Sequence, residues 1–268
     1  MHNVALQVQD FFRRSGFPLD CGVWRAQDPE VNADVEKLYH AIREKEGWLY
    51  PDARVAQLPL VPGSDAHAFQ WKARGYSCDR LSKYLIRHYH GGSVLDLGCG
   101  NGWMSARLAG EGYSVCGLDL HYQELLQGAR VFNDVPNLCF LYGNVFNDVL
   151  PEKFFNFIIM ASSFQYFGDA PQLLKRLFIL LRPGGEIHIV DTPFYTSAER
   201  DSAAGRSKRY YAGIGYPSFA GYYFHRTLDE LSGYSYVRIG PPNRVANALR
   251  RFFRRGISPF PWIVIKKP

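Results

Sequence analysis

Glycine occupies every second position of a short turn that stands between two carboxylates. The turn covers residues 98–102 and comes directly after an apolar run at 94–97, within which lies Asp96. Glycine lets the backbone turn tightly and lets a ligand approach without obstruction by a Cβ atom. Asp119 ends the next apolar run, where open α/β sheets place the carboxylate that accepts hydrogen bonds from ribose hydroxyls. The pattern therefore predicts a site for a ligand that contains a nucleoside.

The residues of the turn disfavour a dinucleotide such as NAD. A dinucleotide turn needs glycine at its first, third and sixth positions, and the sixth position here is Trp103. A Trp there is hard to reconcile with close packing of helix on strand. Asp96 is unhelpful beside a pyrophosphate, but it suits a cationic ligand that carries an amino group. We therefore expect a nucleoside with a positively charged end.

The elements that must position this turn alternate between strands and helices. The apolar runs predict strands at 93–97, 114–118, 138–142, 155–161 and 185–190, and two closing strands at 236–239 and 262–265. Helical patterns fall near 103–110, 122–132 and 170–181. Such alternation is typical of a doubly wound sheet with right-handed crossovers. We predict a three-layer α/β sandwich with a Rossmann-like sheet of seven mostly parallel strands, in which 262–265 is an antiparallel edge strand.

The sequence predicts a division into an N-terminal helical cap and a main domain. Residues 1–75 predict a helical cap, and residues 76–268 form the main domain. Within the main domain, residues 194–226 are an aromatic-rich insertion and residues 241–261 a basic excursion. The aromatic insertion suits either a lid over an acceptor pocket or a structural extension that packs on the helical cap.

Composition excludes several classes of protein. The chain has 268 residues, of which 47% are hydrophobic, with 25 Gly and 16 Pro, so it is not disordered, collagenous or a coiled coil. No apolar run approaches the roughly 20 residues of a membrane span, and no secretory signal is visible. The five Cys are scattered without a C-x-x-C pair, which favours reduced thiols in a cytoplasmic protein and predicts no metal cluster.

The net charge of +6 is unevenly distributed. Residues 200–268 carry +10, whereas residues 1–199 carry −4. Much of the excess comes from a cluster of arginines: Arg250, Arg251, Arg254 and Arg255. Such a cluster fits a solvated helix face first, an anionic substrate or a membrane surface next, and nucleic acid last.

The stretch 94–102 resembles the signature of the class I S-adenosylmethionine-dependent methyltransferases, and the similarity covers roughly residues 75–240. Asp119, the triplet 143–145 after the third strand and Leu-Arg-Pro-Gly-Gly at 181–185 agree with it. In that family the glycine turn cradles the methionine end of the cofactor, the first acid lies near its amino group and the second binds the ribose. The resemblance implies these cofactor-binding residues: Asp96, Gly98, Cys99, Gly100, Asp119, Leu120, Asn144, Val145 and Ser162. The family often has Asp in place of Asn144, and Asn can still donate and accept at an adenine edge.

The resemblance also locates candidate catalytic residues. In the family, the loop after the fourth strand borders the methyl group and the acceptor, and here it contains Ser162, Gln165 and Tyr166. It lacks the Asn/Asp-Pro-Pro-Tyr/Phe form typical of enzymes that methylate amino groups on bases or glutamine. Asp191 ends the fifth strand, where it could orient or deprotonate an acceptor or simply cap the strand. His225 ends the aromatic insertion and could act as a general base. Tyr166, Asp191 and His225 are therefore the catalytic candidates.

These features favour one function: transfer of a methyl group from S-adenosyl-L-methionine to a small-molecule acceptor, anionic or aromatic. An RNA methyltransferase that uses the basic C-terminal region is a second hypothesis, ranked lower because no RNA-binding appendage is recognisable. A non-catalytic protein that retains the cofactor site is a third, and a lipid-linked acceptor is also open. The sequence does not specify the acceptor atom or the oligomeric state.

Overall fold

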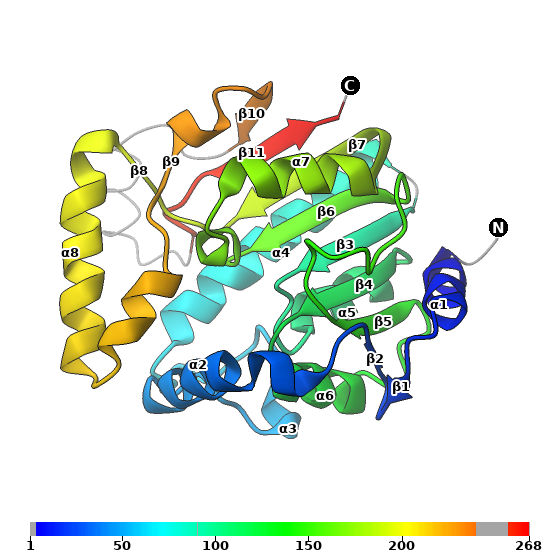
Figure 1. Cartoon of the computed structure of the whole chain (residues 1–268), viewed down its shortest axis with the longest axis horizontal. Helices are drawn as coiled ribbons and strands as arrows, with labels where there is room; N and C mark the ends of the chain where they lie inside the picture. Colours follow the sequence, from blue (N-terminus) through cyan, green and yellow to red (C-terminus); the bar gives the residue numbers. More distant parts are fainter. Residues whose placement is uncertain (1–3, 90, 240–256, 268) are drawn as a thin grey trace.

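The structure is a computed structural model that describes residues 4–89, 91–239 and 257–267. A nine-stranded sheet lies at its centre, with helices on both faces (Figure 1). Across the sheet the strands are β1 (Leu19–Asp20), β2 (Val23–Arg25), β5 (Leu138–Tyr142), β4 (Ser114–Asp119), β3 (Ser93–Leu97), β6 (Phe155–Ala161), β7 (Leu181–Val190), β11 (Trp262–Lys266) and β10 (Tyr236–Ile239). Two short strands, β8 (Phe194–Tyr195) and β9 (Arg226–Thr227), pair separately.

The helices connect these strands in the predicted alternation. The α-helices are α1 (Val4–Arg14), α2 (Ala33–Lys45), α3 (Asp52–Val55), α4 (Ala68–His88), α5 (Trp103–Gly110), α6 (Tyr122–Val131), α7 (Ala170–Leu180) and α8 (Ser197–Gly213). Short 3-10 helices are η1 (Pro29–Asn32), η2 (Phe164–Tyr166), η3 (Pro217–Tyr222) and η4 (Leu228–Leu231). None of the helices described is long and apolar enough to cross a membrane.

The central part of the sheet confirms the predicted fold class. Strands β5, β4, β3, β6 and β7 are neighbours in that order and pair in parallel. Their carboxyl ends therefore lie at one edge of the sheet, where doubly wound folds bind their ligands. The glycine turn follows β3, the strand in the middle, so the fold places it at the centre of this edge.

The borders of the sheet differ from the prediction in two respects. Strand β11 is antiparallel to β7, as expected, but it lies between β7 and β10, so the prediction that it is an edge strand is wrong. At the other border β2 pairs in parallel with β5 and carries β1, which raises the strand number from seven to nine. Strands of two and three residues are too short to show a period of alternation, so the sequence pattern could not reveal them.

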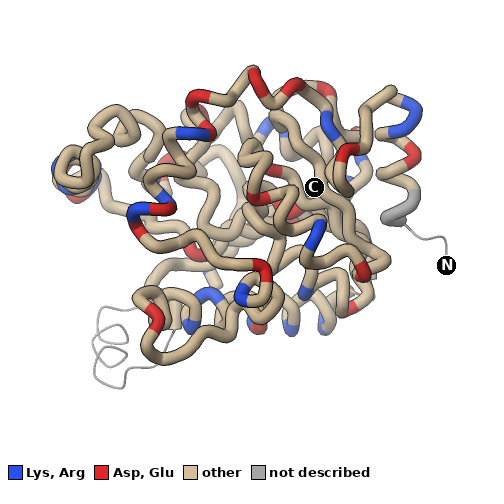
Figure 2. The backbone as a smooth tube through the Cα atoms, turned by 90° about the horizontal axis from the view of Figure 1, so that it is seen from below, with Lys and Arg blue, Asp and Glu red and all other residues tan. Residues whose placement is uncertain are grey.

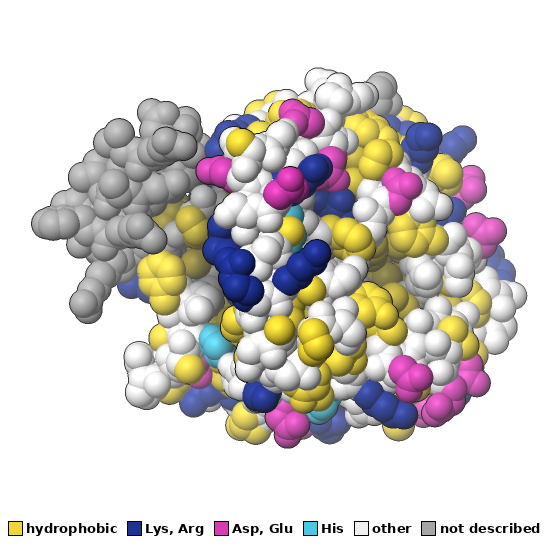
Figure 3. Space-filling model, turned by 60° about the vertical axis from the view of Figure 1, so that its left-hand side comes forward, with side chains coloured by type: hydrophobic (Ala, Val, Ile, Leu, Met, Phe, Trp, Pro, Cys, Tyr) yellow, Lys and Arg dark blue, Asp and Glu magenta, His cyan; other side chains and the backbone are white. Residues whose placement is uncertain are grey.

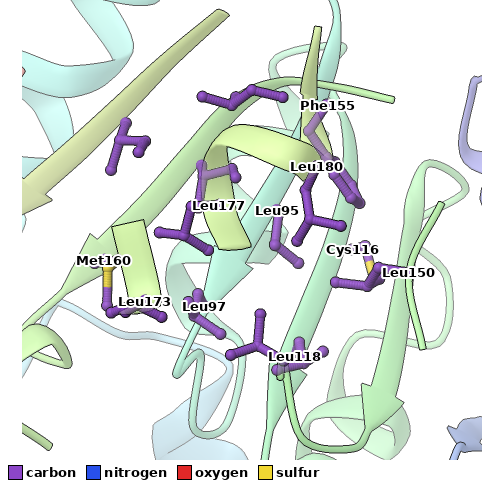
Figure 4. Packing of buried hydrophobic residues seen from close by; sticks show 14 of the residues in the cluster. Leu95, Leu97, Cys116, Leu118, Leu150, Phe155, Met160, Leu173, Leu177 and Leu180 are labelled. Atoms are coloured by element: carbon purple, nitrogen blue, oxygen red, sulfur yellow. The ribbon is translucent and has the colours of Figure 1, made fainter. Parts of the chain in front are cut away.

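Two hydrophobic clusters lie on the two faces of the sheet. Along β3, Leu95 and Leu97 face α1 and α7, whereas Val94 faces α4 and α5. Figure 4 shows the first cluster, with Leu173, Leu177 and Leu180 of α7 over the central strands. Because neighbouring residues of a covered strand are buried on opposite sides, the runs are apolar throughout rather than alternating. This double burial holds the carboxyl edge of the sheet rigid beneath the site.

The helical cap and the aromatic insertion are packed against each other. Ile42 of α2 is buried against Tyr211 of α8 and Phe219 of η3. Two polar contacts join the same segments: Tyr210 donates to Glu46 at 2.7 Å, and Lys45 donates to the carbonyl of Ile214 at 2.7 Å. In Figure 1, α8 stands to one side of the sheet with η3 running back from it toward α2. The packing of insertion on cap is one of the two roles that the sequence left open for these residues.

Some predictions for these additions fare less well. Helix α4 runs across the predicted division at residue 75, and the cap contributes two strands besides its helices. The sequence did not predict α8, because only Ala203 and Tyr211 are buried along its 17 residues and no apolar period is visible. The arginine cluster at 250–255 and most of the basic excursion lie outside the described residues. The division at residue 75 stays a prediction.

Candidate active site

The glycine turn has the backbone conformation that its sequence demands. Gly98, Gly100 and Gly102 have φ angles of +76°, +55° and +72°, values that only glycine adopts without strain. The amide of Gly98 donates to the carbonyl of Leu118 at 2.8 Å, which ties the turn to the end of β4. The amide of Gly100 donates to the Asp119 carboxylate at 2.7 Å. The turn and the second acid therefore form one hydrogen-bonded unit.

Asp96 is a buried carboxylate directly beneath the turn. Its side chain accepts a hydrogen bond from the Ser105 hydroxyl at 2.6 Å through Oδ2, while Oδ1 has no hydrogen-bond partner. Burial raises the pKa of Asp96 to about 6, which means that the folded protein penalises its negative charge. A cation beside Oδ1 would relieve that penalty. The predicted contact of Asp96 with the amino group of a cationic nucleoside is consistent with this unpartnered oxygen.

Asp119 is held by backbone amides at both oxygens. Besides the bond from Gly100, it accepts one from the amide of His121 at 2.9 Å. Burial, and then the negative charge of Glu124, raise the pKa of Asp119. His121 caps the N-terminus of α6: its Nδ1 accepts from the amide of Glu124 at 3.1 Å, and its ring stacks on His40 of α2. His121 thus fixes a helix end beside Asp119.

A cavity opens above the turn, and the helical cap supplies much of its wall. Its lining combines the turn with residues from α2, α4, α6 and the ends of β6 and β7: Tyr39, Arg43, Trp48, Trp71, Arg74, Gly98, Cys99, Gly100, Asn101, Trp103, Met104, Glu124, Ala161, Ser162 and Asp191. Its volume is about 100 Å³. Small-molecule sites typically measure about 300–1,000 Å³, so a nucleoside-sized ligand requires these side chains to move apart.

Five residues of the cap line this cavity, and the sequence analysis identified none of them: Tyr39, Arg43, Trp48, Trp71 and Arg74. They lie on α2, on the connection after it and at the start of α4, which are distant in sequence from the glycine turn. The only sequence signal is the concentration of Arg and Trp between residues 43 and 74. Glu124 was also missed, because it reads as an ordinary acid in the first turn of a helix.

The residues predicted to bind the cofactor divide into three groups. Gly98, Cys99, Gly100 and Ser162 line the cavity. Asp96 and Asp119 do not line it: Asp119 is bonded to Gly100, which does, whereas Asp96 is bonded to Ser105, which does not. The remaining three do not line it: Leu120, Asn144 and Val145. Of these, Leu120 is exposed, Asn144 accepts from the amide of Phe146 and Val145 is packed in the core.

Ser162 and Asp191 end adjacent strands in unusual backbone conformations. Both have positive φ angles, +56° and +54°, which are rare outside glycine and cluster at functional sites. The Ser162 hydroxyl donates to the backbone carbonyl of Asp191 at 3.3 Å, and the Ser77 hydroxyl donates to the Asp191 carboxylate at 2.7 Å. Burial raises the pKa of Asp191. This carboxylate is the predicted catalytic residue that faces the cavity.

The other two catalytic candidates are placed differently. Tyr166 lies in the cluster that joins cap and insertion, where its ring packs edge-on against Tyr39 and Tyr223, and it does not line the cavity. His225 does not line it either: its Nε2 is hydrogen-bonded to Ser207 of α8 at 2.9 Å. The geometry therefore does not favour contact between His225 and a reacting group in this cavity, and the catalytic role of His225 stays a prediction. Among the described residues, no group of three His, Cys, Asp or Glu side chains is arranged to hold a metal ion.

Comparison with known sequences decides the family. Residues 69–232, more than half of the chain, match the family described as "Methyltransferase domain". The chain is a class I S-adenosylmethionine-dependent methyltransferase. This confirms the predicted family, enzyme class and cofactor. The residues that would hold the cofactor fit it, because Gly98, Cys99 and Gly100 line the cavity and Asp96 presents an unpartnered, buried oxygen.

Individual relatives of this methyltransferase are distant. A demethylmenaquinone methyltransferase of Listeria welshimeri is 29% identical over 114 residues, which cover 40% of this chain and 48% of the relative. The chain therefore spans about half the length of the curated relatives it matches. Among solved structures, the YcgJ protein of Bacillus subtilis has a TM-score of 0.53 at 14% identity, over 72% of this chain and 96% of that one. An S-adenosylmethionine-dependent methyltransferase from Mesorhizobium loti has a TM-score of 0.50 at 18% identity, over 70% and 96%. At these identities the likeness shows the fold alone.

The raised pKa of Asp96 predicts how cofactor binding depends on pH. Since the pKa of Asp96 is raised from 3.8 to about 6 in the folded protein, stability falls as pH rises between these values, and a cation bound to the ionised carboxylate offsets the loss. Below about pH 6 the carboxyl is protonated and attracts a cation no better than an amide. We therefore expect Asp96→Asn to weaken S-adenosylmethionine binding strongly at about pH 7.5, with the ratio of the two Kd values falling toward one near pH 5.

Calorimetric titration of both proteins across this range measures the ratio. Asp119 and Glu124 also have raised pKa values, so the absolute affinity of both proteins changes with pH, whereas the ratio isolates Asp96. A ratio that stays constant from about pH 7.5 to 5 would show that the Asp96 charge plays no part in binding.

Proposed function

We propose that this methyltransferase transfers the methyl group to a small-molecule acceptor that binds in the cavity between the glycine turn and the helical cap. The observation that supports this most is enclosure. Side chains of α2 and α4 line the cavity, and α2 is in turn held by the aromatic insertion. A polymer would need an open groove beside the reacting atoms, whereas a small molecule can be surrounded.

In this proposal the glycine turn, Asp96 and Asp119 hold the cofactor, with the turn and Asp96 at its methionine end. The sulfonium supplies a methyl group that is already activated, so the protein needs mainly to align the acceptor and to exclude water. Holding reactants in line can contribute about 7–11 kcal/mol to lowering the barrier. The rigid ends of β6 and β7, with Ser162 and Asp191, are suited to that alignment.

Asp191 is the proposed proton acceptor where the acceptor atom carries a proton. The sulfonium–methyl bond would break as the acceptor–methyl bond forms, leaving S-adenosylhomocysteine, and the Asp191 carboxylate would take up the acceptor's proton. Burial raises the pKa of Asp191, which makes it a stronger base than an exposed carboxylate. Ser77 fixes the orientation of one oxygen. We assign Tyr166 to positioning instead, because its ring packs where cap and insertion meet.

The relatives give limited support for a small acceptor. The Listeria protein's name specifies demethylmenaquinone, and by analogy an aromatic small molecule is one acceptor class for this chain. The RNA hypothesis predicts a continuous basic surface, but acidic and basic positions are interspersed along the described backbone (Figure 2). Lys and Arg side chains do gather on the outer face of α8 (Figure 3), which carries Arg200, Arg206, Lys208 and Arg209.

Transfer of a radiolabelled methyl group separates these alternatives. The full chain is incubated with S-adenosylmethionine labelled in the methyl group and with a cell extract divided into dialysable molecules, RNA and protein. We expect label in the dialysable fraction and none in RNA. Label in RNA, lost as salt is raised, would overturn the small-molecule proposal. Asp191→Asn serves as the matched variant and should reduce transfer while leaving the binding of S-adenosylhomocysteine intact.

A further inference from the structure

Two arginines of the helical cap converge on one indole ring inside the cavity. Arg43 of α2 and Arg74 of α4 each have the guanidinium carbon 4.6 Å from the ring centre of Trp48. Arg74 also lies 5.0 Å from the ring centre of Trp71. Both arginines line the cavity together with these two Trp residues. Two like charges are thus held near each other in a partly desolvated space, which costs free energy unless an anion joins them.

The protein leaves most of the bonding capacity of these guanidinium groups unused. Arg74 has no hydrogen bond or ion pair with any described residue. Arg43 has one carboxylate neighbour, Glu46 at 3.4 Å, while its Nε is buried without a partner. Burial, and then the charge of Arg43, lower the pKa of Arg74. A planar guanidinium with free donors is the group best matched to a carboxylate or phosphate.

The groups nearest to this pair compensate Arg43 more than Arg74. Burial opposes the charge of Arg43, but Tyr39, Tyr166, Glu124 and Glu46 outweigh it and raise the pKa of Arg43, whereas the pKa of Arg74 is lowered. Glu124 and Asp191 also line the cavity, yet neither comes within ion-pair distance of Arg43 or Arg74 in the described structure. Arg43 and Arg74 line the same cavity as Asp191, which follows the end of β7, where the acceptor is proposed to bind. Asp96 and Asp119, beneath the turn, are assigned to the cationic cofactor in the proposed function.

We propose that Arg43 and Arg74 form an anion-binding subsite that recognises a carboxylate on the methyl acceptor, with the rings of Trp48 and Trp71 beside its apolar or aromatic body. This rests on the proposed function, since it names the acceptor's chemical class. The α-carboxylate of the cofactor is the other source of the same chemistry. If the pair binds the acceptor's carboxylate, variants of Arg43 and Arg74 should lose affinity for the acceptor. If it binds the cofactor's α-carboxylate, they should lose affinity for the cofactor instead.

Benzoate and benzamide are the probes, because they share shape and differ in charge. Each is titrated calorimetrically into the full chain, both alone and saturated with S-adenosylhomocysteine. We expect the saturated protein to bind benzoate about tenfold more tightly than benzamide. Arg43→Met and Arg74→Met should each remove that preference while changing the affinity for S-adenosylhomocysteine by no more than about twofold. Arg74→Lys, which retains charge without the planar fork, should retain part of it.

The control variant is Arg13→Met, which removes a guanidinium that lies over Trp24, on α1 and away from the cavity. It should leave both titrations unchanged. If Arg43→Met and Arg74→Met lower the melting temperature, Arg43→Lys and Arg74→Lys replace them in the titrations, and each should show a smaller preference for benzoate over benzamide than the wild-type protein. Loss of S-adenosylhomocysteine binding with unchanged benzoate binding would overturn the proposal and assign the pair to the cofactor. Equal binding of benzoate and benzamide to the saturated wild-type protein would overturn it as well. Failure of the wild-type protein to bind S-adenosylhomocysteine would instead contradict the cofactor site, and the titrations without it would still test the subsite.

Discussion

Replacing Asp119 with alanine is expected to weaken S-adenosylmethionine binding at least about 100-fold. The carboxylate holds the amides of Gly100 and His121, and each oxygen has a further lone pair for a ribose hydroxyl. A hydrogen bond to a charged group contributes about 1.5–3 kcal/mol, so losing two of them costs about 3–6 kcal/mol. The substitution also frees the Gly100 amide, which loosens the turn on which the cofactor rests. Calorimetric titration of the cofactor measures the loss.

The control for this variant must show that the effect is local. Asp148→Ala removes a fully exposed aspartate whose one ion pair, with Arg176 at 3.4 Å, lies away from the cavity. It should bind the cofactor like the wild-type protein. Asp119→Asn keeps the shape of the side chain and one acceptor oxygen, so its affinity for the cofactor should fall between those of Asp119→Ala and the wild-type protein. Undiminished binding by both Asp119 variants would contradict the assignment of this residue to the ribose.

The part of the site that the sequence predicted is the part that lies on regular elements. Asp96 and Asp119 sit within or at the end of strands whose apolar runs are long enough to recognise. Once the strands are known to be parallel and adjacent, their carboxyl ends must meet, and the turn must lie between them. The same reasoning brought Ser162 and Asp191 to this edge. Local pattern and topology were sufficient here.

The cap side of the site could not be predicted in this way. Arg43 and Arg74 reach the cavity because α2 and α4 pack over the sheet edge, and α2 is positioned by α8 and η3, more than 150 residues later in the chain. Such contacts depend on tertiary packing, which leaves no periodic signal around either arginine. The ring of His225, for a related reason, contacts Tyr195 and Tyr223 within the insertion and does not line the cavity, and its catalytic role stays a prediction.

Gly102→Ala is expected to destabilise the whole domain by about 2–5 kcal/mol. Its φ of +72° imposes about 1–2 kcal/mol of strain on any residue with a Cβ atom. The new Cβ would also lie 2.3 Å from a ring atom of Phe140, a buried residue of β5, so the core must shift at a cost of about 1–3 kcal/mol. Urea unfolding followed by circular dichroism measures this as a lower midpoint with an unchanged slope.

The matched control lies at the other end of the helix that follows the turn. Gly110 ends α5 without a positive φ, and a Cβ atom there would meet nothing within 4 Å. Gly110→Ala should therefore stabilise the protein by about 0.4–1 kcal/mol, since alanine has less freedom to lose on folding. The opposite signs of two identical substitutions, eight residues apart, separate the demand of the turn from any general effect of removing glycine. If Gly102→Ala were as stable as the wild-type protein, the left-handed turn and its contact with β5 could not be the structure that supports the cofactor.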